Sequence, residues 1–281
     1  MLLACSGGPE VVAGMVAIEG DAVTLRTQSI GGPPPGAAMG PLPPPPGAPG
    51  HPPKKTAKPA DPKPWAFYGG DGVEQSVSVD AFWIDVHEVT RAAYQEFVLE
   101  TGYPAPHVAE EWADDGWNWE GTTPPKGTEQ HPVVLVSWND ARAYCAWAGK
   151  RLPTEAEWQL AALGPGEGRA YPWGNTYDPS KLNHGMMQEP NFDDSDGFAR
   201  TAPVGSYADN GGAFDLFGNA WEFTSSYRVD DPSNASAPLG LYVAVRGGSY
   251  YFDVGPNPIG ERHQFLTEIR RKTSGFRCAR S

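Results

Sequence analysis

The distribution of aromatic residues divides this chain into two unequal parts. All 32 Trp, Tyr and Phe residues of the 281-residue sequence lie after position 64. Residues 31–64 contain 14 Pro and 6 Gly, so this segment cannot bury enough apolar surface to offset the entropy of ordering it. We expect a disordered, polyproline-rich tether over residues 31–64 and one folded domain over residues 65–281. The pattern leaves open whether residues 1–30 are ordered.

The charge of the chain excludes several classes of partner. Its formal net charge is -13, and the part after residue 64 alone carries -14. Because nucleic acids and anionic membranes repel such a surface, we expect neither to bind it through charge. No run of residues approaches the roughly 20 apolar positions of a membrane-spanning helix. Three cysteines are too few for a scaffold built on disulfides.

A short pattern near the start of the chain, Leu2–Leu3–Ala4–Cys5, resembles the lipobox of bacterial lipoproteins. In a lipobox the cysteine is lipidated and becomes the mature N-terminus. A flexible Pro/Gly-rich tether after Cys5 suits such an anchor. The pattern predicts a protein of the bacterial cell envelope, in the periplasm or at the cell surface, that meets the membrane only through its lipid. A chance match at an ordinary exposed cysteine is the alternative.

The first half of the domain contains clear local signals. Residues 76–84 alternate between apolar and polar side chains, which predicts a strand. A helix is expected over residues 90–101, because Thr90 can cap its start and Gly102 can end it. The apolar, β-branched residues 133–136 predict a short strand or an extended entry to the next element.

Two more helices follow in the sequence. One is expected to begin at Ser137 or Asn139 and to end at Gly149. Another begins at Thr154, because Thr154 and Glu157 have the spacing of a capping box.

The last third of the chain is rich in Gly, Asn, Asp and Pro and has few periodic segments. A strand-like run occurs at residues 241–245, while most of residues 164–281 should form irregular loops. Long loops in a compact domain need a fixative or a function. The many carboxylates and Asn side chains indicate bound metal.

Several motifs identify a resemblance. They include Gly-Lys-Arg-Leu-Pro-Thr-Glu-Ala-Glu-Trp at 149–158, Phe-Gly-Asn-Ala-Trp-Glu at 217–222, Gly-Gly-Ser at 247–249 and Gly-Phe-Arg-Cys at 275–278. In this order they resemble the formylglycine-generating enzyme (sulfatase-modifying factor) family, and the resemblance covers residues 65–281. It implies an α+β fold, the family's variant of the C-type lectin fold, loop-rich with short strands and a few helices.

Two structural calcium sites are implied by the resemblance. Hard oxygen ligands in long loops are what calcium accepts, although any one of these acids taken singly could instead cap a turn. The first site would use Asn183, His184, Asp196 and Phe198. The second would use Asp215, Gly218, Ala220 and Glu222.

The resemblance also implies a disulfide between Cys145 and Cys278, as in the secreted relatives. Two buried free thiols are the alternative in a reducing cytosol. The choice depends on localisation, and an exported chain is expected to form the bond.

This chain lacks the two cysteines that the resemblance assigns as copper ligands. The resemblance assigns copper(I) to two cysteines, three and eight residues after the Ser of Gly-Gly-Ser, where this chain has Phe252 and Asn257. Neither side chain suits a soft copper(I) ion, so we expect no copper and assign no catalytic residue. The six histidines show no paired spacing for iron.

A recognition surface remains. The resemblance places the family's substrate groove around Gly-Gly-Ser and the loop after it, where aromatic side chains stand beside charged ones. Core packing is the alternative reading of the aromatic members. The candidate groove residues are Trp221, Ser249, Tyr251, Phe252, Asp253, Asn257, Arg262 and His263.

Together these features predict a lipid-anchored binding or accessory module for an unidentified peptide, glycan or envelope protein. One alternative is an enzyme of the family with altered oxidoreductase chemistry, like the relative that acts in pyoverdine maturation. True formylglycine generation on sulfatases is the other, and it requires the copper site that is absent here.

Overall fold

A computed structural model of the chain describes residues 12–27, 73–114, 116–164, 169–185, 194–207, 212–227, 242–251 and 263–281. Cys5 and the predicted tether at residues 31–64 lie outside the described residues. Within them the fold is mixed, with three α-helices and short strands in three sheets. None of the described helices is long and apolar enough to span a membrane.

The central sheet is built entirely from the last quarter of the chain. Its strands lie in the order β7 (His263–Leu266), β6 (Tyr242–Arg246), β5 (Trp221–Tyr227) and β8 (Ser274–Gly275). β6 pairs antiparallel with β5 and β7, whereas β8 pairs parallel with β5. The strand-like run expected at residues 241–245 therefore corresponds to β6.

The N-terminal strands of the described chain pair with strands of the folded domain in two further sheets. β1 (Met15–Ile18) pairs with β4 (Phe82–Asp85), which also pairs with β9 (Ala279–Arg280), so the two ends of the domain meet in one sheet. β2 (Asp21–Thr27) pairs antiparallel with β3 (Val73–Val79). Residues 15–27, whose order the sequence left open, thus pair with the rest of the domain.

The single strand expected at residues 76–84 is wrong, because the chain breaks there into two strands. β3 ends at Val79 and β4 begins at Phe82, and the two belong to different sheets. The partner strand breaks opposite, between Ile18 and Asp21. Gly20 packs so closely in this break that a Cβ would lie 2.6 Å from the carbonyl oxygen of Val79. Alternation of side chains does not reveal such a paired break.

The three helices begin where their capping signals predicted. Thr90 caps α1 (Arg91–Thr101), and Gly102 ends it in the left-handed conformation with φ 70°. Ser137, not Asn139, caps α2 (Trp138–Trp147) through a capping box. Thr154 caps α3 (Glu155–Leu163) through the predicted box with Glu157.

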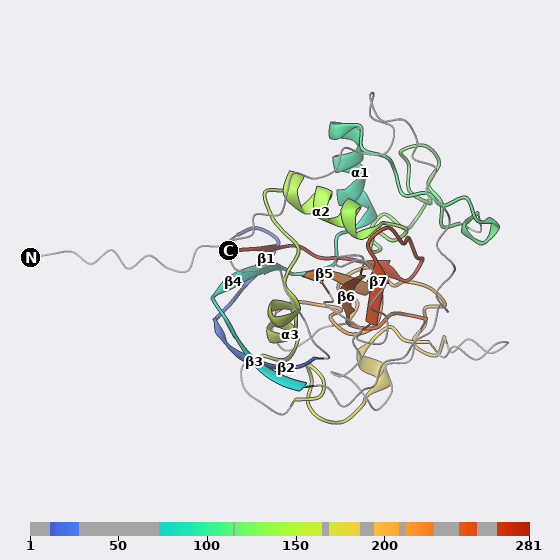
Figure 1. The fold of residues 1–281 in the computed structure, drawn as a ribbon. Helices are drawn as coiled ribbons and strands as arrows, with labels where there is room; N and C mark the ends of the chain where they lie inside the picture. The colour runs from blue at the N-terminus through green and yellow to red at the C-terminus, as the bar shows by residue number, and fades with distance from the viewer. Residues whose placement is uncertain are drawn as a thin grey trace, which may run out of the picture.

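Figure 1 shows α1 and α2 together on one side of the β5–β6–β7 sheet, while α3 lies between that sheet and the β2–β3 ribbon. Side chains of α1 and α2 share a core with those of β5 and β6. The predicted disulfide is present: Cys145 of α2 bonds to Cys278, with a Cα–Cα distance of 5.7 Å. This bond ties the helical layer to the C-terminal segment.

Residues 133–136 form the extended entry that was one of the two expectations for them. All four are buried, and Leu135 has a φ of 59°, which interrupts any strand. Between α3 and β5 the described residues contain one short 3-10 turn, Pro179–Lys181, and otherwise irregular backbone. The loop-rich second half expected from the sequence is confirmed.

Candidate functional site

The first predicted calcium set is brought together by two loops. Both oxygens of the Asp196 carboxylate accept backbone hydrogen bonds, from His184 N at 2.8 Å and from Phe198 N at 2.9 Å. Asn183 is fully buried, and its Nδ2 donates to Arg200 O and to Asn219 Oδ1. Its Oδ1 is buried and accepts no hydrogen bond from the described part of the chain. Asp196 thus binds the backbone of the residue that follows Asn183, and a buried orphaned amide oxygen and a carboxylate at adjoining positions suit a hard cation.

The second predicted set meets the first but is occupied by an ion pair. Gly218 packs against Asn183, where a Cβ would lie within 2.2 Å of the Asn183 carbonyl oxygen. Arg277 forms a two-pronged ion pair with Glu222, with an Nη2–Oε1 distance of 2.7 Å. Trp158 Nε1 donates to the remaining side of the same carboxylate at 2.7 Å. Three N–H groups already bind this carboxylate, and the Arg277 guanidinium places a positive charge against it, so the second set does not fit calcium in this arrangement.

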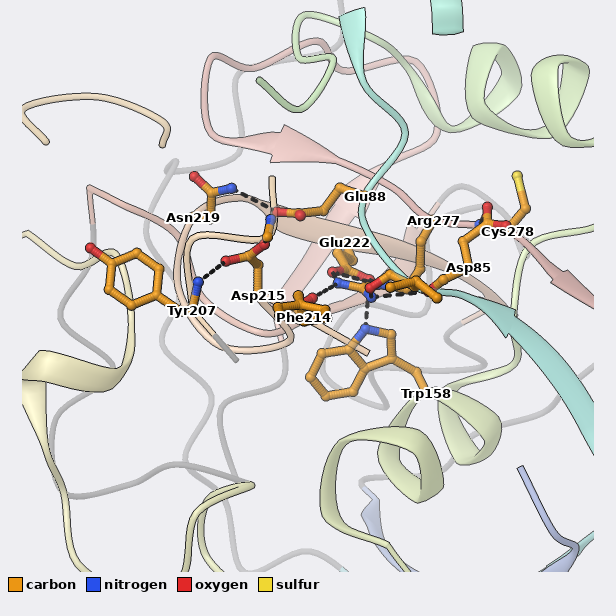
Figure 2. A network of polar contacts seen from close by, with 12 residues as sticks. Asp85, Glu88, Trp158, Tyr207, Phe214, Asp215, Asn219, Glu222, Arg277 and Cys278 are labelled. Atoms are coloured by element: carbon orange, nitrogen blue, oxygen red, sulfur yellow. Dashed lines mark hydrogen bonds and ion pairs between the residues drawn. The ribbon is translucent and has the colours of Figure 1, made fainter. Parts of the chain in front are cut away.

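Arg277 is the centre of a buried polar network, which Figure 2 shows in close-up. Besides Glu222 it binds three carbonyl oxygens, including Phe214 O at 2.7 Å and Asp85 O at 3.2 Å. Asp85 accepts the backbone N–H of Cys278 and an ion pair from Lys150 at 2.6 Å. The network therefore connects β4, the loop before β5 and the disulfide. Its role is structural, because it holds distant segments together.

Two further acids lie beside this network. Asp215 accepts backbone N–H groups of Gly205 and Tyr207, and burial raises its pKa to about 6. Glu88 is fully buried and accepts Asn219 Nδ2 at 2.9 Å (Figure 2). Burial, reinforced by the charge of Asp215, raises the pKa of Glu88 well above its usual range. Even so, no three His, Cys, Asp or Glu side chains among the described residues are placed to hold a metal ion together.

The described groove candidates differ in their exposure. Trp221 and Ser249 are fully buried, and Trp221 belongs to the main core. His263 packs its ring 4.4 Å from that of Trp221, and burial lowers the pKa of His263 to about 4, so its imidazole is neutral at physiological pH. Tyr251 is partly exposed and lies 5.1 Å from the ammonium of Lys272. Of the two interpretations of the aromatic candidates, groove or core packing, Trp221 therefore fits core packing, whereas Tyr251 reaches the surface.

Four other groove candidates and the lipidation candidate lie outside the described residues. They are Phe252, Asp253, Asn257, Arg262 and Cys5.

Sequence reasoning missed a group of four residues beside the groove. Two arginines lie over the ring of Trp117, Arg91 at 5.8 Å and Arg200 at 4.9 Å, and the ring of Tyr250 stacks on the same indole at 5.9 Å. We call these residues, Arg91, Trp117, Arg200 and Tyr250, the arginine–tyrosine cluster. No spacing in the sequence connects them, because they come from four separate segments.

A family model and known proteins match most of this chain. The profile of the sulfatase-modifying factor enzyme 1-like domain matches residues 55–281. The formylglycine-generating enzyme of Bos taurus is 33% identical over 257 residues, covering 75% of this chain and 68% of the bovine protein. The inactive C-alpha-formylglycine-generating enzyme 2 of Mus musculus is 34% identical over 251 residues, covering 75% of this chain and 79% of that protein.

A solved structure shares the fold. PvdO from Pseudomonas aeruginosa superposes with a TM-score of 0.63 at 22% identity, covering 95% of this chain and 94% of that chain. At this identity the likeness concerns the fold alone. It confirms the predicted loop-rich α+β class.

Proposed function

Since the chain belongs to the sulfatase-modifying factor family of formylglycine-generating enzymes, we propose that it is a binding or accessory module without copper-dependent cysteine oxidation. One observation carries this proposal. The chain has three cysteines, and the Cys145–Cys278 disulfide uses two of them. Cys5 is the remaining thiol, so one chain has no pair of thiolates with which to hold copper(I).

The side chains at the two expected copper-ligand positions also speak against copper binding. Phe252 and Asn257 stand where the resemblance assigns the two copper ligands. A phenyl ring donates no lone pair, and an amide oxygen is a hard ligand that a soft ion binds poorly. The residues present do not fit copper, and no step of the function is routed through it.

What the groove offers instead is recognition. Tyr251 and Lys272 lie together, and Lys272 also lies 6.0 Å from the ring of Trp112, which is 41% exposed. Aromatic rings beside a cation at a surface are typical of binding sites for peptides and glycans. With His263 neutral, the groove contributes hydrogen bonds and apolar contact rather than acid catalysis. The proposed ligand is a peptide, a glycan or an envelope protein.

We propose one structural calcium ion, at the first predicted set. Asn183 Oδ1 and Asp196 would hold it, together with the carbonyl oxygens of His184 and Phe198, and the ion would stabilise loops that have little regular structure. Thermal unfolding should move to higher temperature with added calcium and return with a chelator. Asn183→Ala should abolish the calcium-dependent shift, while Asn118→Ala, a change at an amide in another loop, should keep it.

We also propose that Cys5 carries a lipid that anchors the protein in the bacterial cell envelope. Expression in a bacterial host with a clickable fatty acid should label the wild type and leave Cys5→Ser unlabelled. Unlabelled wild-type protein in the soluble fraction would contradict the anchor and leave the binding function untouched.

The decisive experiment for the function is an aldehyde assay. The purified chain is incubated with copper, oxygen and a Cys-x-Pro-x-Arg peptide, with the bovine formylglycine-generating enzyme as positive control, and the peptide mass is measured. We expect unmodified peptide from this chain. Formylglycine in its product would overturn the proposal.

A photo-crosslinking amino acid tests the binding side. Placed at Tyr251, it should capture a discrete adduct in cell envelopes. Placed at Leu99, which is 62% exposed on α1, it should not. Equal capture at both positions would remove the assignment of the ligand to the groove.

A further inference from the structure

The arginine–tyrosine cluster contains a buried hydroxyl that the described part of the chain does not satisfy. Tyr250 is 5% exposed, and its hydroxyl has no hydrogen-bond partner among the described residues. The two guanidinium groups and the Tyr250 ring all lie against one indole, that of Trp117. Burial raises the pKa of Tyr250, and the charges of Arg200 and Arg91 both oppose that rise. A buried hydroxyl that nothing binds is rare in native structures and needs a reason.

Arg91 adds a buried charge. It is 2% exposed at the first turn of α1, donating through Nη1 to Thr128 Oγ1 at 2.6 Å and through Nε to Pro132 O at 3.4 Å. Within the described segments it forms no ion pair, and the acid whose charge acts on it, Glu129, has an exposed carboxylate at the surface. Burial lowers the pKa of Arg91 to about 10, and the charge of Arg200 pushes it in the same direction. A buried guanidinium next to a second one favours a negative partner.

Arg200 brings the cluster to the surface. It is exposed, and its Nη1 lies close to the loop before Trp117: a Cβ at Gly116 would lie 3.4 Å from that nitrogen. Gly116 has a φ of 73°, so a glycine suits the position on two grounds. The cluster thus extends from the exposed Arg200 to the buried Arg91 and Tyr250, and all three lie against the Trp117 indole.

We propose that the arginine–tyrosine cluster binds an oxyanion, either a carboxylate or a sulfate or phosphate group, carried by the ligand of the neighbouring groove. Guanidinium groups donate two parallel hydrogen bonds to such oxygens, and the Tyr250 hydroxyl would donate a third. Tyr250 stands between Ser249 and Tyr251 of the groove, so a ligand there is within reach. The ligand is therefore acidic. This inference rests on the proposed binding function and names its substrate class.

A positive site also has a consequence on this particular domain. The chain after residue 64 has a net charge of -14, so most of its surface repels anions. The two arginines offer an acidic ligand a local positive charge on this acidic domain. The site would select acidic ligands because it is locally positive on a domain that is negative as a whole.

Calorimetric titration of the full-length protein tests the site with inorganic sulfate and, separately, with acetate, at constant ionic strength set by chloride. We expect one saturable site, and the tighter of the two probes identifies the ligand group as tetrahedral or planar. Tyr250→Phe should weaken binding about tenfold and Arg200→Gln at least as much. Arg142→Gln is the matched control, because Arg142 also lies over an indole, that of Trp138 at 4.5 Å, outside the cluster. It should leave the affinity unchanged.

Thermal unfolding keeps the test independent of folding defects. In chloride alone, Tyr250→Phe should unfold at or above the wild-type temperature, because it removes an unsatisfied hydroxyl. Saturating sulfate should raise the unfolding temperature of the wild type more than that of the variant. Anion binding that is absent, or is equal in the wild type, Tyr250→Phe and Arg200→Gln, would overturn the proposal.

The outcomes separate this proposal from the one it rests on. Crosslinking at Tyr251 without sulfate or acetate binding keeps the groove function and removes the oxyanion site. Anion binding without crosslinking keeps the site and removes the groove as its context.

Discussion

Two buried charged regions of this molecule differ in how fully their polar groups are hydrogen-bonded. Around Arg277, the guanidinium, the Glu222 carboxylate and the Trp158 indole satisfy one another and three backbone carbonyls. In the arginine–tyrosine cluster, the Tyr250 hydroxyl has no partner in the described chain, and Arg91 forms no ion pair with a described carboxylate. Arg277 and Glu222 are thus satisfied by groups of the chain, whereas the Tyr250 hydroxyl is not satisfied by any described group.

The difference separates structural charge from binding charge. A complete buried network holds distant segments together, and removing one member leaves the other uncompensated. An incomplete network is a cost that a ligand can relieve. The comparison therefore predicts loss of stability from changes in the Arg277 network and loss of affinity from changes in the arginine–tyrosine cluster.

The largest effect is expected from Arg277→Met. This change leaves the Glu222 carboxylate buried beside Asp215 and Glu88 with no positive charge, which should lower the free energy of unfolding by about 3–5 kcal/mol. Urea denaturation followed by tryptophan fluorescence measures it. The double variant Arg277→Met, Glu222→Gln should recover part of the loss. A loss below about 1 kcal/mol in the single variant would mean that the network is not structural.

The next effect concerns the disulfide that adjoins this network. Cys145→Ser with Cys278→Ser should lower the free energy of unfolding by about 2–4 kcal/mol, because the bond closes a loop with a sequence separation of 133 residues. Arg91 and Tyr250 lie away from the bond, so sulfate affinity should be retained if the variant is folded. Equal stability of the variant and the wild type would show that packing alone holds α2 to the C-terminal segment.

A smaller loss of stability is expected when the pH is lowered, because His263 is buried in its neutral form. Burial lowers its pKa from 6.5 to about 4, so the unfolded state takes up the proton first as pH falls. The stabilisation is complete above pH 6.5 and is lost between pH 6.5 and 4, by about 2 kcal/mol for this partly exposed ring.

The check is the difference in unfolding free energy between wild type and His263→Phe at several pH values. Taking this difference cancels the opposite contribution of Asp215, whose raised pKa stabilises the fold as pH falls through about 6. A difference that stays constant from pH 7 to pH 4 would contradict the neutral, buried imidazole.

The smallest effect is expected from Tyr250→Phe in the absence of anions. Removing an unsatisfied buried hydroxyl should raise the free energy of unfolding by about 0.5–1 kcal/mol, while the ring keeps its stacking on Trp117. Tyr103→Phe is the matched control, since its hydroxyl donates to Asp140 at 3.0 Å and its loss should destabilise. Destabilisation by Tyr250→Phe would show that the hydroxyl is already satisfied.

The sequence predicted the parts of the fold that are encoded locally. Thr90, Ser137 and Thr154 mark the three helix starts because a capping side chain and its N–H partner lie three residues apart in sequence. Gly102 marks an end because glycine readily adopts the left-handed conformation, in which its N–H binds Val98 O four residues earlier. The break between β3 and β4 was missed, since it depends on Gly20, some 60 residues earlier in the chain.

The candidate site was predictable only where a motif carries it. Residues of the Gly-Asn-Ala-Trp-Glu motif were found, yet the role of Glu222 was not, because its partner Arg277 lies 55 residues away. The arginine–tyrosine cluster had no signal at all. Arg91 looked like an ordinary helix residue, and its burial arises from tertiary packing against the loop at Pro132.

Competition for copper(I) against a chromogenic chelator tests whether this chain keeps the family fold without a copper-binding pair of thiolates. The double variant Phe252→Cys, Asn257→Cys restores the two cysteines and is the comparison. We expect the wild type to leave the chelator fully loaded and the double variant to withdraw one equivalent of copper. One equivalent withdrawn by the wild-type chain, with its Cys145–Cys278 bond intact, would show that the chain has a copper site after all.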